Sequence, residues 1–201
     1  IYEMYGNYQS VLNLTERIIN HLSKKLLGTT ELVYGKTKIS LAMPFKTIEM
    51  IDLINEVCGV DFNTVTDFVT AKQLAAKHKV ILQSFHNSIG HIINEFFEQK
   101  CEDKLIDPTF VVGYPIEVST LAKKRPNNNY LTDRFELFIA GREYANGFSE
   151  LTDSIDQYER FVKQTEEAKL GNDETNPIDG DFITALEYGM PPTGGVGIGL
   201  D

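Results

Sequence analysis

The stretch RFELFIAGREYANGFSE, residues 134–150, has the pattern of two strands joined by a tight turn. Phe135, Leu137 and Ile139 alternate with other residues, and this period of two is typical of a strand that buries one face. Ala140-Gly141-Arg142 has the composition of a turn, so we predict an antiparallel pair at this point of the chain. We place the two strands at 131–139 and 142–150.

Glutamates at positions 136, 143 and 150 lie within this strand pair. A carboxylate near a buried sheet face is costly unless a cation lies beside it, so each glutamate needs a positive partner. Glu143 has the opposite parity from Glu150, and the two can share a face only if a β-bulge shifts the register. We predict such an irregularity between Glu143 and Asn146.

Asn146, Phe148 and Glu150 share parity, so their side chains point to one face of the second strand. An amide, an aromatic wall and a carboxylate, roughly 6–7 Å apart per step, suit an extended ligand with a cationic tip. The alternative is that Asn146-Gly147 forms a type I′ hairpin turn with solvated glutamates, and spacing alone slightly favours this alternative.

The stretch GGVGIGLD, residues 194–201, places glycines on one face of a strand and apolar side chains on the other. The glycines are Gly195, Gly197 and Gly199, and the apolar residues are Val196, Ile198 and Leu200. A flat ring or a phosphate could lie directly on a backbone stripped of side chains in this way. A glycine strand made for close sheet packing remains the alternative, and a dinucleotide-binding βαβ unit is only weakly indicated.

Composition narrows the class of protein. The 201 residues, 42% hydrophobic and 24% charged, suit one globular domain, and no apolar run approaches the roughly 20 residues of a membrane span. The two cysteines have no metal spacing or disulfide framework, which favours a reducing cytosol. The net charge of −10 argues against a nucleic-acid footprint on this segment. The opening IYEMYGNYQS lacks an initiator Met, so we expect that an N-terminal part of the natural protein is absent.

Periodicity and turn residues predict helices alternating with short strands. We expect a strand near the start, a hairpin at Gly35, a strand in PTFVV, a loop at 123–129 and helices over 8–27, 47–58, 70–78, 88–101, 153–170 and 181–188. The four histidines share no metal-site spacing, and we expect most of them on helix surfaces or half-buried. The resulting class is α+β, with an antiparallel sheet flanked by helices.

Four blocks resemble class II lysyl-tRNA synthetases in this order and spacing: IYEMYGNY, GYPIEVSTLAK, LTDRFELFIAGREYANGFSELTD and DFITALEYGMPPTGGVGIGLD. The NGFSEL and LEYGMPPTGGVGIGLD segments are the most specific. The resemblance implies that residues 1–201 are the C-terminal portion of a catalytic domain built on a six-stranded antiparallel sheet. It also implies that the first motif, most of the second, the arginine of the third and the anticodon-binding domain are missing. Thr120 departs from the family's usual proline in its SPLAK turn, which leaves the local loop geometry in question.

The resemblance assigns roles to residues by position. It places the substrate lysine against Tyr2, Asn146, Phe148 and Glu150, with Glu150 pairing the ε-ammonium beside the Tyr2 hydroxyl. It places ATP against Glu136, Glu143, Gly195, Gly197 and Gly199, with Mg²⁺ on the two glutamates. The resemblance assigns no residue as a catalytic base, since attack of a carboxylate on a phosphate needs positioning and charge neutralisation more than proton removal.

The expected activity is an ATP-dependent ligase that forms lysyl-adenylate and transfers lysine to tRNA(Lys). We expect a cytoplasmic protein without membrane association, a homodimer at full length, and no activity from this fragment alone. One alternative is a paralogue that lysylates a protein, in which a glycine of the third-motif strand tends to be alanine. The other is a non-catalytic binding module, which would have no need of the three glutamates.

Overall fold

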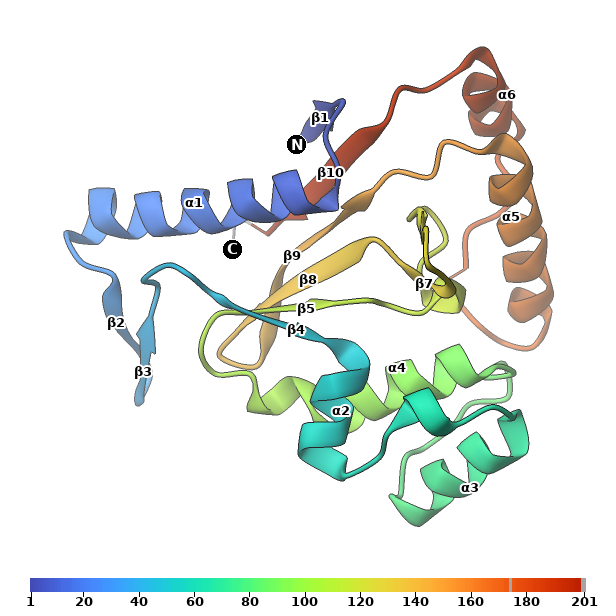
Figure 1. The fold of residues 1–201 in the computed structure, drawn as a ribbon, viewed down its shortest axis with the longest axis horizontal. Coiled ribbons are helices and arrows are strands. Elements are labelled where there is room, and N and C mark those ends of the chain that lie inside the picture. Colours follow the sequence, from blue (N-terminus) through green and yellow to red (C-terminus); the bar gives the residue numbers. More distant parts are fainter. Residues whose placement is uncertain (174, 200–201) are drawn as a thin grey trace.

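A six-stranded sheet runs through the middle of the protein, in the order β1-β10-β9-β8-β5-β4 (Figure 1). The structure is a computed structural model that describes residues 1–173 and 175–199. The strands are β1 Tyr2–Met4, β4 Lys46–Glu49, β5 Thr109–Val112, β8 Arg134–Ile139, β9 Arg142–Ser149 and β10 Thr193–Ile198. Neighbouring strands pair antiparallel except β4 and β5, which are parallel. The predicted α+β class is confirmed, with this one parallel pair as the exception to an antiparallel sheet.

Helices surround the sheet, and two small hairpins project from it. The helices are α1 Tyr8–Leu27, α2 Met50–Cys58, α3 Phe68–Lys77, α4 Ile89–Lys100, α5 Ser154–Lys169 and α6 Gly180–Tyr188, with 3₁₀ turns at η1 Phe62–Thr64, η2 Glu102–Lys104 and η3 Ile116–Val118. The hairpins are β2 Glu31–Tyr34 with β3 Thr37–Ser40, and β6 Lys124–Arg125 with β7 Asn128–Thr132. The helix before the first hairpin begins at a capping box of Asn7 and Ser10 and ends at Gly28, whose φ of 70° is left-handed.

Three sequence predictions were wrong in part. Residues 46–49 form β4 rather than the first turn of the helix predicted at 47–58, because they pair with β5. The segment 123–129 is largely the β6–β7 hairpin and not a plain loop. His86 and His91 are buried, and their rings stack with centroids 5.6 Å apart.

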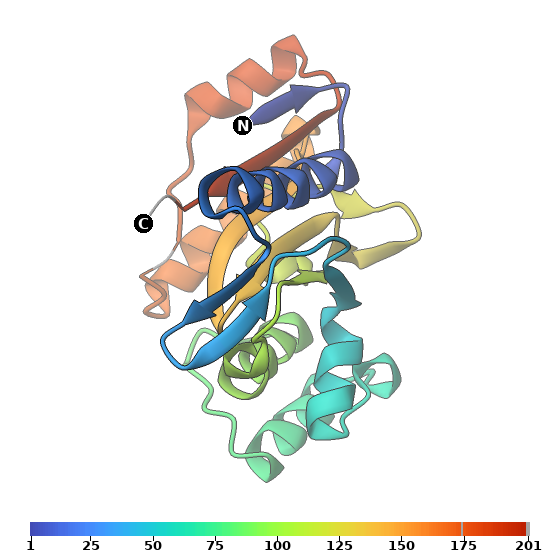
Figure 2. The ribbon, with the colours of Figure 1, turned by 90° about the vertical axis from the view of Figure 1, so that its left-hand side faces the viewer.

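One face of the sheet is closed by α1 and the segment that follows it. Val11 and Leu12 of α1 pack with Ile39, Leu41 and Phe45 against inward side chains of the sheet. Those sheet residues are Phe110, Val112, Phe135, Leu137, Ile139, Ala145 and Val196. In Figure 2, α1 and the β2–β3 hairpin lie in front of the sheet. This face is therefore filled by side chains.

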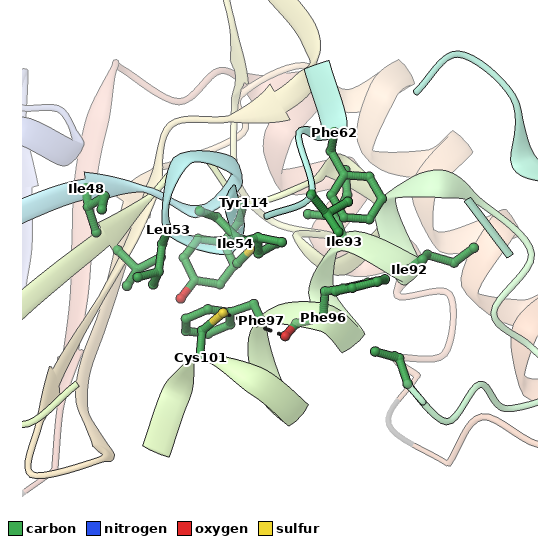
Figure 3. Close-up of a cluster of buried hydrophobic side chains, with 14 of the residues drawn as sticks. Ile48, Leu53, Ile54, Phe62, Ile92, Ile93, Phe96, Phe97, Cys101 and Tyr114 are labelled. Atoms are coloured by element: carbon green, nitrogen blue, oxygen red, sulfur yellow. Dashed lines mark hydrogen bonds between the residues drawn. The ribbon is translucent and has the colours of Figure 1, made fainter. Parts of the chain in front are cut away.

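The opposite face is covered at its β4–β5 end by α2, α3 and α4. Figure 3 shows this second cluster, in which Phe96 and Phe97 of α4 lie among side chains from α2 and the sheet edge. Burying each phenylalanine contributes about 1.5–3 kcal/mol, which fixes α4 against the sheet. Tyr114 belongs to this cluster, and its hydroxyl extends from it toward the polar residues of β8. The helical layer thus forms one wall of the open part of the face.

No helix in the described part of the chain is long and apolar enough to cross a membrane.

Candidate functional site

Two rows of side chains run across the open face of β1, β10, β9 and β8. One row consists of Tyr2, Gly195, Phe148 and Arg134. The next row consists of Gly197, Asn146 and Glu136. Since residues directly opposite each other on paired strands share a face, the register brings these predicted site residues together. Asn146 lies within β9, so the alternative that Asn146-Gly147 is a hairpin turn is wrong.

A bulge in β9 adds Glu143 to the same face. Leu137 pairs with Ala145 and Phe138 pairs with Glu143, which leaves Tyr144 as the extra residue between them. The predicted irregularity between Glu143 and Asn146 is therefore confirmed. Because Phe138 shares its face with Glu136, its partner Glu143 does too.

Glu150 lies at the end of β9 with its carboxylate over the backbone of β10. Its amide donates to Thr193 O at 2.8 Å, and the residue forms a single bridge with Ala122. A Cβ at Gly195 would overlap Glu150 Oε1, so only a glycine lets the carboxylate keep this position over the strand. Burial raises the pKa of Glu150 to about 7. Within the described ranges no cation forms an ion pair with Glu150.

The glycine face of β10 has two different parts. Gly195 is covered by Glu150 and by the ring of Tyr2, whose Cε1 lies 3.1 Å from a Cβ built on that glycine. At Gly197 and Gly199 the nearest atom to such a Cβ is 3.9 Å away, and both glycines are exposed. The predicted bare backbone is therefore found at Gly197 and Gly199. Leu200, which belongs to the same pattern, lies outside the described residues.

Arg134 is the central residue that sequence analysis missed. Its Nη2 pairs with Glu136 Oε1, its Nε donates to Asn146 Oδ1 at 3.2 Å, and its Nη1 donates to Ser119 Oγ at 3.0 Å. The guanidinium also lies 4.6 Å from the ring centroid of Tyr114. The prediction that Glu136 needs a cation is thus met first by Arg134. The available signal was its parity, since Arg134 lies two residues before Glu136 on one strand.

Tyr114 completes the surroundings of Glu136. Its hydroxyl donates to Glu136 Oε2 at 2.7 Å, so each oxygen of this buried carboxylate has one donor. Each carboxylate oxygen has a second lone pair, which remains available to a cation. Glu136 can therefore bind a metal while it is held by Arg134 and Tyr114.

An acidic cavity of about 780 Å³ opens beside Glu136 and Glu143. Glu98 of α4 and Glu102 of η2 line one side of it, and Phe138 and Arg134 line its sheet side. Burial, followed by repulsion from neighbouring carboxylates, raises the pKa of Glu98, Glu102 and Glu143. A wall of this charge repels a free phosphate and favours a phosphate that arrives with a divalent cation.

The carboxylates of Glu136 and Glu143 suit magnesium better than a metal held entirely by protein. The described part of the chain contains no cluster of three or more His, Cys, Asp or Glu side chains able to hold a metal. Mg²⁺ is commonly bound through one or two carboxylates, with phosphate oxygens and water completing its octahedron. The chemistry of this pair therefore fits the predicted magnesium site.

Comparison with known proteins gives one consistent family. All residues, 1–201, match the family model described as tRNA synthetases class II (D, K and N). The chain is 52% identical over 201 residues to a lysine–tRNA ligase of Lysinibacillus sphaericus, 51% identical over 201 residues to that of Bacillus subtilis, and 51% identical over 200 residues to that of Listeria welshimeri. Each match covers 100% of this chain and 40% of the relative, so the chain spans about 40% of the length of these curated relatives.

Proposed function

The chain belongs to the class II tRNA synthetases of the D, K and N type, and from this premise we propose that it is the substrate-binding part of a lysine–tRNA ligase. The single observation that carries the choice of lysine is Glu150. A partly desolvated carboxylate without a cationic partner, beside an aromatic ring, is suited to an alkylammonium group. Aspartate and asparagine, the other amino acids of this family type, have no cationic side chain.

The row geometry supports a specific orientation for lysine. The ε-ammonium would pair with Glu150, and the aliphatic stem would lie along Phe148 on the same face. Asn146 Oδ1 already accepts a hydrogen bond from Arg134 Nε, so both hydrogens of Asn146 Nδ2 remain for the α-carboxylate end of the substrate. Tyr2 lies beside Gly195, and a contact from its hydroxyl to the ammonium stays a prediction.

ATP would lie beside the lysine, on the part of the open face formed by Gly197, Gly199 and Glu136. Gly197 and Gly199 leave room for a flat ring against the backbone of β10. Glu136 and Glu143 would hold Mg²⁺, which when bound neutralises phosphate charge. Arg134 would keep Glu136 in place, and through Asn146 it links the nucleotide side to the lysine side.

The reaction we propose is attack of the lysine carboxylate on the α-phosphorus, with pyrophosphate leaving, followed by attack of a terminal ribose hydroxyl of tRNA(Lys) on the lysyl carbonyl, with AMP leaving. The chain's own part is to hold the two reactants in line, which can supply several orders of magnitude in rate without a protein base. With its net charge of −10, this part of the protein would leave most of the tRNA contact to other parts. A homodimer and a cytoplasmic location also remain our proposals.

The test is lysine-dependent exchange between ATP and labelled pyrophosphate, measured on the protein at its full natural length, followed by aminoacylation of tRNA(Lys). Exchange should be strong with lysine and absent with aspartate or asparagine. Exchange driven by either of those amino acids would contradict the proposal. Exchange with lysine but transfer to a protein acceptor would favour the paralogue, which the intact Gly195, Gly197 and Gly199 argue against.

A further inference from the structure

We propose that Arg160 of α5 is a positioning residue for the substrate site, acting through the loop of residues 119–122. This inference rests on the proposed function, because it assigns Arg160 to the geometry of the same site. Among the residues that the structure describes, Arg160 forms no hydrogen bond with a predicted ligand-binding residue: its partners are Asp156, Ser119 and Ala122.

Arg160 holds both ends of the loop. Its side chain is 5% exposed, and its Nη1 donates to Ser119 O at 2.9 Å and to Ala122 O at 2.7 Å. Nε and Nη2 donate to the two oxygens of Asp156, each at 3.1 Å. A two-point ion pair of this kind fixes the plane of the guanidinium, so the carbonyls it binds are fixed relative to α5.

The first end of the loop supports Arg134. Ser119 Oγ accepts a hydrogen bond from Arg134 Nη1 at 3.0 Å, and the neighbouring Val118 carbonyl accepts from the same nitrogen. Arg134 in turn binds Glu136 and Asn146. A displacement of Ser119 would therefore move the Arg134 side chain and, with it, these two site residues.

The second end of the loop supports Glu150. Ala122 forms a bridge with Glu150, and Leu151 N donates to Leu121 O at 3.0 Å. Lys123 N donates to Ser149 O at 2.8 Å. These bonds fix the backbone on both sides of the carboxylate that we assign to the ammonium.

Thr120, in the middle of the loop, is also held by α5. Gln157 Nε2 donates to Thr120 O at 3.1 Å, and Gln164 Nε2 donates to Thr120 Oγ1. A proline at this position has no hydroxyl and could not accept the second bond. The departure from the family's proline is therefore compensated by a contact from the same helix that carries Arg160.

Three residues of the loop, Ser119, Thr120 and Ala122, are thus hydrogen-bonded to side chains of α5. Removing Arg160 would leave the Ala122 carbonyl and Asp156 without this buried donor, while the Ser119 carbonyl would keep only its bond from Ala122 N at 3.1 Å. Asp156 keeps a second partner, Lys124 Nζ at 3.0 Å, so its charge does not become isolated. The main consequence is a looser loop, and through it a less exact placement of Glu150 and Arg134.

The experiment uses the full-length protein with Arg160→Lys, Thr120→Val and, as a matched control, Lys163→Met on the exposed side of α5. Arg160→Lys should raise the KM for substrate lysine by about 10- to 100-fold, because the single ammonium nitrogen of the new side chain cannot reproduce the planar fork of Nε, Nη1 and Nη2 that binds Asp156, Ser119 and Ala122. Thr120→Val should raise it by about 2- to 10-fold, the equivalent of one hydrogen bond. The KM for ATP should rise by less in both variants, because the loop is bonded directly beside Glu150 but reaches Glu136 only through Arg134, and the control should match the wild type.

Hydrogen exchange at the amides of Lys123 and Leu151, measured without substrate, reports directly how firmly the loop is bonded to the end of β9. We expect faster exchange at both amides in Arg160→Lys, and no change in the control. A lower melting temperature with unchanged exchange and unchanged lysine KM would overturn the proposal, since Arg160 would then only stabilise the fold. If Arg160→Lys fails to fold, an unchanged lysine KM in Thr120→Val overturns it instead. If the wild type activates a different amino acid, the proposed function is refuted. The hydrogen-exchange rates of Lys123 and Leu151 would still decide whether Arg160 holds the loop.

Discussion

Replacing Glu150 with glutamine should stabilise the protein at pH 8 while it abolishes efficient use of lysine. Burial raises the pKa of this carboxyl from 4.5 to about 7. At about 1.4 kcal/mol per pKa unit, a full shift of this size would cost about 3 kcal/mol of folding free energy above pH 7. Because the side chain is only half-buried, solvent screening reduces this to about 1–2 kcal/mol.

The sign of the pH dependence follows from the direction of the shift. A carboxyl whose pKa is raised in the folded state favours folding below its unfolded pKa, and this contribution is lost as the pH rises through about 7. The glutamine variant has no such titration. Its stability advantage should therefore be full at pH 8 and should shrink steadily toward pH 5.

Lysine binding should respond in the opposite direction. The variant keeps the shape of the side chain but offers the ammonium no counter-charge, and breaking a buried ion pair costs about 3–5 kcal/mol. The kcat/KM for lysine should fall by roughly two to three orders of magnitude, with little change in the KM for ATP. In the wild type, lysine affinity should weaken as the pH falls below about 7, because Glu150 becomes protonated.

The assay is urea unfolding of the full-length protein at pH 8 and pH 5, paired with lysine-dependent pyrophosphate exchange. Glu159→Gln, at an exposed position of α5, serves as the matched control and should change neither quantity. A glutamine variant at position 150 that is less stable than the wild type at pH 8 would refute a desolvated, unpaired carboxylate. Tight lysine binding by that variant would refute its assignment to the ammonium.

The remaining predictions divide the site by role. Glu143→Gln should raise the KM for ATP and the Mg²⁺ requirement, while lysine binding measured without nucleotide stays near normal; an equal loss of lysine binding would contradict this division. Gly197→Ala, whose new methyl would meet no atom within 3.9 Å, should fold normally but raise the KM for ATP, and an unchanged KM would show that no ligand lies there. Gly195→Ala would displace the Glu150 carboxylate and should raise the KM for lysine instead, as separate titrations of the two substrates would show. Residues 1–201 span about 40% of the length of the relatives that they match, and we predict that alone they do not catalyse pyrophosphate exchange, because the loss of one phosphate-binding donor costs roughly 10²–10³ in rate; robust exchange would contradict this prediction.

Local patterns in the sequence were enough to predict most of the elements. The helix over Tyr8–Leu27 was predicted from its apolar stripe and from Gly28, which ends it with a left-handed residue. The β9 bulge was also predictable, because Glu143 could share the face of Glu150 only through an extra residue. These features depend on residues close together in the chain, where spacing carries the physical information.

Other features depend on contacts between distant parts of the chain. Residues 46–49 have no strong strand pattern, and only their pairing with β5 makes them a strand. His86 and His91 stand at unremarkable positions in the sequence, yet they are buried against Glu95 and Glu167 respectively. Burial of this kind is decided by which elements pack together, and no local spacing encodes it.

The site shows the same division. The sequence determined which face carries Glu136, Asn146, Phe148 and the glycines, since parity along a strand fixes the side on which each residue lies. Only the tertiary structure decided that Arg134 is the first partner of Glu136, and that Arg160 holds the loop behind Glu150 from a helix 38–41 residues further along the chain. The physical reason is that a hydrogen bond or an ion pair forms only when two groups come within about 3 Å, and for distant segments the packing of the whole domain sets that distance.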